Sequence, residues 1–184
     1  MALASLLAAA AYLPAAAHQH GHDTAHHAPL PYAGMERGSV KALSPEQEDD
    51  LLAGRGNGLA LAAELNGYPG PLHVLELATP LQLSDEQQRR TEGLFRAMKA
   101  QAVALGKGVL AEEATLDRLF ADQQITEATL DEITRRAAVA QGRLRAAHLR
   151  FHLAMLEVLT PQQIEAYRRL RGYSAPAMLH PRRQ

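Results

Sequence analysis

The sequence predicts an all-α protein: a long antiparallel helical hairpin, with short helices before it and one short helix after it. Three observations favour this class. A helix-start motif occurs three times, two long segments have helical apolar periodicity, and aromatic residues are rare. Only eight of the 184 residues are Tyr or Phe and none is Trp, which suits helix packing better than a thick β-sandwich.

The helix-start motif is an apolar residue followed by Ser/Thr-x-x-Gln, and its hydroxyl residues are Ser44, Ser84 and Thr160. Such a hydroxyl accepts a hydrogen bond from a free amide of the first helical turn, while the Gln reaches back to the N–H of the capping residue. Pro45 and Pro161 follow two of these caps, at a position where a missing N–H costs nothing. We therefore expect helices to begin near residues 44, 84 and 160.

Two long segments form the body of the expected hairpin, residues 85 to 121 and 127 to 158. The first has a heptad-like stripe with a gap near Glu112, and Gly106 and Gly108 weaken it locally. The second has unbroken 3,4 spacing, and a short connection with Thr126 as the next N-cap joins the two. The stripe residues are Leu94, Met98, Ala102, Leu105, Val109, Leu116 and Phe120, then Leu130, Ile133, Ala137, Ala140, Leu144, Ala147, Phe151, Ala154 and Val158.

Shorter helices are expected at residues 44 to 53, 59 to 65, 72 to 78 and 161 to 170. Asn57 is the expected cap of the second, and Gly67 is expected in a left-handed conformation after it. The last helix should end at Gly172. The glycine-rich stretch 54 to 58 does not resemble a phosphate-binding loop, because no strand precedes it and no Lys-Ser/Thr follows it.

The ends of the chain divide it into four expected regions. An apolar run from Ala2 to Leu13, followed by small residues up to Ala17, predicts a signal peptide over residues 1 to 17 and a periplasmic location. The run is too short to cross a bilayer, so we expect no stable membrane insertion. A disordered His-rich tail at 18 to 40, a helical domain at 41 to 173 and a flexible tail at 174 to 184 complete the chain.

Charge is unevenly distributed along the chain. The formal net charge is −1, but residues 18 to 125 carry −6 and residues 126 to 184 carry +5. Two halves of opposite charge suit antiparallel pairing within one hairpin or between two chains. A single thin hairpin also leaves its apolar stripe uncovered. For both reasons we expect a homodimer. The Arg clusters lie mostly off the apolar stripe, which indicates solvated helix faces and no nucleic-acid partner.

The motif also carries a family resemblance. The third copy, Leu159 to Gln163, reads as the LTxxQ motif of the Spy/CpxP family of periplasmic helical proteins, and the second copy, Leu83 to Gln87, is a close variant. The resemblance covers roughly residues 80 to 173. It implies a bent helical hairpin that dimerises into a cradle, whose concave face holds unfolded client chains without ATP. The similar proteins ZraP and CnrX bind zinc or nickel during metal stress.

A candidate metal site lies on the second long segment. His148 and His152 are one turn apart, and Met155 is three residues further on, so all three project from one helix face. Such a pair suits Cu, Ni or Zn, but two ligands on one helix are an incomplete site. Completing ligands would come from His73, Glu76 or Glu64. The alternative is that the histidines pack as half-buried side chains beside the partner helix, at the seam formed by Ala147 and Phe151.

A second candidate metal site is the tail, with His18, His20 and His22 at its start. If cleavage follows Ala17, the new N-terminal amine, two amides and the third-position imidazole form a square-planar set for Cu(II) or Ni(II). The alternative is a solvated tail that binds metal only adventitiously.

Two functions follow from these patterns. The first is a Spy/CpxP-like stress protein that binds unfolded client proteins, or a membrane sensor or anti-sigma partner, and that responds to metal. The alternative is a periplasmic sensor or resistance protein for Cu, Ni or Zn. The sequence contains no nucleophile–base set and no cofactor fingerprint, so we expect neither an enzyme nor an organic cofactor.

Overall fold

The structure, a computed structural model, describes residues 32, 34, 36 and 38 to 173. This part of the chain contains six helices and no strand, which confirms the predicted all-α class. The helices are α1 (Pro45–Ala53), α2 (Leu61–Glu64), α3 (Pro71–Glu76), α4 (Asp85–Ala121), α5 (Glu127–Met155) and α6 (Pro161–Leu170). None of the helices described is long and apolar enough to cross a membrane.

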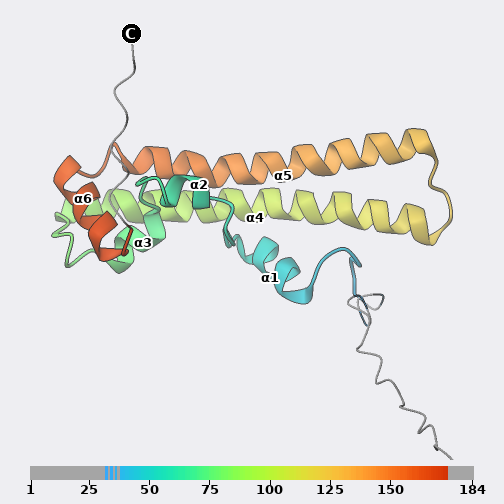
Figure 1. Ribbon diagram of the computed structural model, residues 1–184, viewed down its shortest axis with the longest axis horizontal. Helices are drawn as coiled ribbons and strands as arrows, with labels where there is room; N and C mark the ends of the chain where they lie inside the picture. The colour runs from blue at the N-terminus through green and yellow to red at the C-terminus, as the bar shows by residue number, and fades with distance from the viewer. Residues whose placement is uncertain (1–31, 33, 35, 37, 174–184) are drawn as a thin grey trace, which may run out of the picture. The chain divides into compact units, whose positions relative to one another are not determined.

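The two long helices, α4 and α5, pack side by side (Figure 1). They run in opposite directions, so the start of α4 lies beside the end of α5. Gln87 near the start of α4 donates a hydrogen bond of 2.9 Å to the carbonyl of Val158, just after α5. Further along, Arg136 of α5 forms an ion pair of 2.8 Å with Glu112 of α4. Helices α1 and α3 both pack on α4.

Two apolar clusters stabilise this arrangement. One lies where α3, α5 and α6 meet, and its buried members are Val74, Leu81, Met155, Val158, Leu159 and Tyr167. The other joins Ala102 and Val109 of α4 to Leu144 of α5. The predicted stripe is wrong at Phe120, whose side chain is 53% exposed, because it lies in the last turn of α4 beside the connection to α5.

Helix boundaries agree with the sequence where a capping residue marks them. Ser44, Ser84, Thr126 and Thr160 are N-caps with complete capping boxes, and α4 has the predicted bounds. Asn57 was expected to cap α2, and this is wrong: the helix starts after Ala60, which makes no side-chain cap. Helix α5 was predicted to end at Val158, but it ends at Met155, and the next three residues form turns. The helix is therefore three residues shorter at this end than predicted.

The glutamines of the two later motif copies bond to each other. Gln87 Nε2 donates to Gln163 Oε1 at 2.8 Å, and Gln163 Nε2 donates to Gln87 Oε1 at 3.0 Å. Each glutamine also closes its own capping box and donates to a backbone carbonyl, that of Val158 or Leu81. The two copies therefore tie together the starts of α4 and α6 and the end of α5.

The paired glutamines predict energetic coupling between the two motif copies. Gln87→Ala and Gln163→Ala should each lower the free energy of unfolding by about 1 to 2 kcal/mol, because each removes a capping bond and leaves part-buried amide partners unpaired. Together they should cost about 1 kcal/mol less than the sum, since both remove the same pair of bonds. Urea unfolding of the single and double variants measures this coupling.

The first motif copy provides the control. Gln47 closes the capping box of α1, but within the described residues its side chain reaches neither of the other glutamines. Gln47→Ala should therefore combine additively with Gln87→Ala. If the double variant of Gln87 and Gln163 lost as much unfolding free energy as the two single variants together, the glutamine pair would not couple the helices.

Candidate functional site

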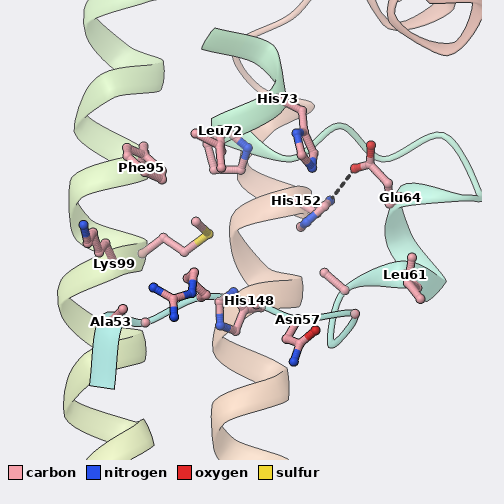
Figure 2. Close-up of a pocket in the computed structure, with 17 residues that line it drawn as sticks. Ala53, Asn57, Leu61, Glu64, Leu72, His73, Phe95, Lys99, His148 and His152 are labelled. Atoms are coloured by element: carbon pink, nitrogen blue, oxygen red, sulfur yellow. Dashed lines mark ion pairs between the residues drawn. The ribbon is translucent and has the colours of Figure 1, made fainter. Parts of the chain in front are cut away.

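A pocket of about 450 Å³ lies between α4, α5 and the segment that carries α2 and α3 (Figure 2). Its lining mixes polar, apolar and basic side chains. The lining includes one carboxylate and three imidazoles, four large apolar side chains and two basic side chains. These are Glu64, His73, His148 and His152, then Leu61, Leu72, Phe95 and Met98, and then Arg55 and Lys99.

Helix α5 positions the two histidines. His148 and His152 are one turn apart, and their side chains are only 3% and 6% exposed. The structural alternative considered for them was half-burial beside the partner helix. Both are buried rather than half-buried, and both line the pocket together with residues of the segment 53 to 73.

The backbone fixes the orientation of His152. Its Nδ1 lies 2.7 Å from the carbonyl oxygen of Tyr68, and because a carbonyl only accepts, Nδ1 carries the proton. In the neutral form of the ring the lone pair is therefore on Nε2. An imidazole that donates one N–H to a carbonyl and presents the other nitrogen is the usual arrangement of a metal-binding histidine.

Gly70 packs closely against the ring that carries this nitrogen. A Cβ atom at residue 70 would lie 3.1 Å from Nε2 of His152 and 3.6 Å from Oε2 of Glu64. Gly70 itself has φ −85° and ψ 144°, a conformation open to any residue. The backbone conformation therefore does not require glycine here, but the close approach of the His152 ring does.

The carboxylate of Glu64 has two different environments. Oε1 accepts hydrogen bonds from the hydroxyls of Tyr167 and Tyr173 and lies 3.4 Å from Nε of Arg171. Oε2 is buried without a hydrogen-bond partner in the described part of the chain, and Nδ1 of His152 is 3.7 Å away (Figure 2). Since an unsatisfied buried oxygen is costly, Oε2 is a candidate ligand atom.

Burial keeps the nearby titratable groups in defined protonation states. Burial, and then the hydrogen bond to Glu64, raise the pKa of Tyr167 far above its ordinary value, so its hydroxyl remains a donor. Burial, and then the neighbouring charge of His152, lower the pKa of His148. His148 is therefore neutral at pH 7, and its buried Nε2 has no hydrogen-bond partner within the described residues.

The structure separates the other predicted ligands. His73 lines the pocket, and its Nδ1 lies 2.9 Å from Oε2 of Glu76, which is exposed and not part of the lining. Met155 is fully buried in the apolar cluster with Tyr167 and is not part of the lining. The tail residues His18, His20 and His22 lie outside the described residues.

Sequence reasoning missed several residues that shape this site. Gly70 lies in a Tyr-Pro-Gly-Pro stretch, a pattern that predicts a turn but no site, and Met98 was assigned to the apolar stripe although it lines the pocket. Tyr167 and Tyr173 follow Glu64 by more than 100 positions. No local sequence pattern relates these tyrosines to Glu64.

The chemistry available is that of a nitrogen and oxygen donor set. Glu64, His73, His148 and His152 share one pocket, yet nowhere in the described residues do three His, Asp or Glu side chains lie close enough to hold a metal ion as they stand. Two donor atoms, Oε2 of Glu64 and Nε2 of His148, are buried and unbonded. Side-chain rotation inside the pocket would be needed to bring three ligands to one point.

Comparisons of the chain with models of protein families, with curated proteins and with solved structures found no match. The resemblance to the Spy/CpxP family therefore depends on the motif copies at Leu83 and Leu159.

Proposed function

We propose that the protein is a Spy/CpxP-like periplasmic stress protein that responds to metal ions, and that the pocket beside α5 is its metal site. The observation that supports this most is the meeting of Glu64 from α2 with His148 and His152 from α5 around one pocket, where two donor atoms are buried without hydrogen-bond partners. Neutral imidazole and carboxylate ligands suit Zn(II), Ni(II) and Cu(II).

The residues present fit such an ion in their chemistry. A bound cation would neutralise the buried carboxylate and satisfy the free nitrogens, which removes the cost of leaving these groups unpaired. The thioether of Met98 from α4 also lines the pocket, and it would favour copper over zinc.

Calorimetry on a chain that begins at residue 31 tests the proposal without the His-rich tail. We expect one Zn, Ni or Cu ion per chain at pH 7.5, and no stoichiometric binding after His148→Ala with His152→Ala. The reason is that α5 holds both imidazoles in fixed relation, so little entropy is lost on binding. The matched control is the full chain, which should retain this site alongside any binding by the tail.

Uptake of no metal by the shortened chain would contradict the metal-site proposal. In that case the two histidines are structural, and only the tail and client binding remain as functions. Equal binding by the double variant would also contradict it, because the metal would then lie elsewhere in the domain.

A second candidate function is client binding, as the family resemblance implies. Leu61 and Leu72 of the pocket lining are 54% and 42% exposed. Other exposed apolar residues of the segment before α4 and of α5 are Leu65, Tyr68 and Leu153. A surface of this kind is typical of sites that bind other chains. We propose that a homodimer forms the expected cradle and offers this surface to non-native proteins.

Aggregation assays separate the two candidates. The metal-free protein should suppress the light scattering of an unfolding client at near-stoichiometric ratio, and Leu65→Ser with Leu72→Ser should weaken this effect. Phe120→Ser, at an exposed apolar residue of the distant end of α4, is the control. Sedimentation should show a dimer, and a monomer at tens of micromolar would oppose the cradle.

A further inference from the structure

Glu64 connects the pocket to the C-terminal helix. Its Oε2 faces the pocket side near His152, while its Oε1 accepts hydrogen bonds from Tyr167 in α6 and from Tyr173 just after it. Arg171, the C-cap of α6, lies 3.4 Å from the same oxygen. One carboxylate thus touches both the proposed metal site and three groups of the segment 161 to 173.

The contacts on the C-terminal side depend on this carboxylate. Tyr167 is 0% exposed and packs in the apolar cluster, and within the described residues its hydroxyl bonds only to Glu64. The guanidinium of Arg171 also lies over the ring of Tyr173, 5.8 Å from its centre. If Glu64 turned away, a buried hydroxyl and a partly buried cation would lose their partner, which is costly.

We propose that α6 is the response element of this site, so that cation binding at the pocket and docking of α6 are coupled through Glu64. The inference rests on the proposed metal-binding function. A cation on Oε2 would hold the carboxylate in the position in which its Oε1 accepts hydrogen bonds from Tyr167 and Tyr173. Because coupling is reciprocal, losing the tyrosine hydroxyls should also weaken cation binding.

The tyrosines are therefore positioning residues, since they would act on the cation only through Glu64. Outer hydrogen-bond partners of a metal ligand commonly change metal affinity by about 10- to 100-fold. We expect metal to make α6 open less often, because it stabilises the position of Glu64 in which the carboxylate holds Tyr167.

Hydrogen exchange on the full chain, with Zn(II) as the probe, tests this coupling. Saturating zinc should slow amide exchange in residues 161 to 173 by about 10-fold or more. The same chain with His148→Ala and His152→Ala should show no such slowing, which separates the pocket from the His-rich tail. Tyr167→Phe with Tyr173→Phe should reduce zinc affinity at the pocket by about 10- to 100-fold and abolish the zinc-dependent slowing.

Arg169→Gln is the control on the same helix, because Arg169 pairs with the exposed Glu165 and does not touch Glu64. It should bind zinc and slow α6 exchange as the unmodified chain does. If Tyr167→Phe impairs folding, Tyr173→Phe alone provides the test, since Tyr173 is only partly buried and its loss leaves the core intact.

Two kinds of failure are distinguishable. If the unmodified chain binds no zinc that depends on His148 and His152, the proposed function fails and the coupling fails with it. If pocket binding is present but α6 exchange does not respond, and the tyrosine variants bind zinc with unchanged affinity, the coupling alone is overturned. Tyr167 and Tyr173 would then serve only to stabilise the fold.

Discussion

Replacing Gly106 by Ala should destabilise the protein by about 2 kcal/mol and loosen α1 from α4. A Cβ atom at residue 106 would overlap the carbonyl oxygen of Leu51 and would lie 3.0 Å from its carbonyl carbon and 3.2 Å from its Cα. These are backbone atoms of α1, so no side chain can rotate to make space. Because backbone atoms cannot move aside, the overpacking cost should be at the upper end of the usual range, about 3 kcal/mol, and the better helix propensity of Ala recovers only about 1 kcal/mol.

Gly108 provides a matched control two residues away in the same helix. It is exposed, and a Cβ there would have nothing within 4 Å. Gly108→Ala should therefore stabilise the protein by about 0.5 to 1 kcal/mol, because only the propensity term remains. Urea unfolding of both variants measures the difference, and a smaller slope for Gly106→Ala would report the detachment of α1.

A lower free energy of unfolding for Gly106→Ala and a higher one for Gly108→Ala would support the close contact of α1 with α4. If Gly106→Ala were as stable as the unmodified chain, α1 would not lie against α4 at Leu51. The sequence indicated only that Gly106 and Gly108 weaken the helix, whereas the structure assigns one of them to a helix contact and leaves the other free.

The helix boundaries were predictable because their causes are local. A hydroxyl followed by a glutamine three residues later satisfies the first amides of a helix without help from distant parts of the chain, and Ser44, Ser84 and Thr160 are N-caps of this kind. Helix α2 has no side-chain cap, so its start depends on packing. For that reason the prediction of Asn57 as its cap was wrong.

The candidate site was predictable only in part. The spacing of His148 and His152 placed them on one face of α5, as the structure has them. Which acid would face them depends on how the segment before α4 folds back over α5, and periodicity does not give this. From the sequence, Glu64 and Glu76 were equally good candidates for the ligand that completes the histidine pair. In the structure Glu64 is buried beside His152, whereas Glu76 is exposed.

Gly70→Ala should weaken metal binding at the pocket by at least about 10-fold although it removes no ligand. The added methyl would lie 3.1 Å from Nε2 of His152 and 3.6 Å from Oε2 of Glu64, and 2.9 Å from Cε1 of the same imidazole. It would push the His152 imidazole out of the position in which its Nε2 can serve as a ligand. The backbone at Gly70 is extended, with φ −85°, so Ala adds no backbone strain.

Calorimetry with zinc on the chain that begins at residue 31 measures this effect, and Gly142→Ala is its control. Gly142 lies on the exposed side of α5 with nothing within 4 Å of a Cβ, so its substitution should leave the affinity unchanged. The free energy of unfolding without metal should fall by about 1 to 3 kcal/mol in Gly70→Ala, because the buried imidazole, which is hydrogen-bonded to Tyr68, has to shift. Zinc affinity equal to that of the unmodified chain would show that Nε2 of His152 is not a ligand, and the ligand set would then have to be sought between His148 and the opposite wall of the pocket.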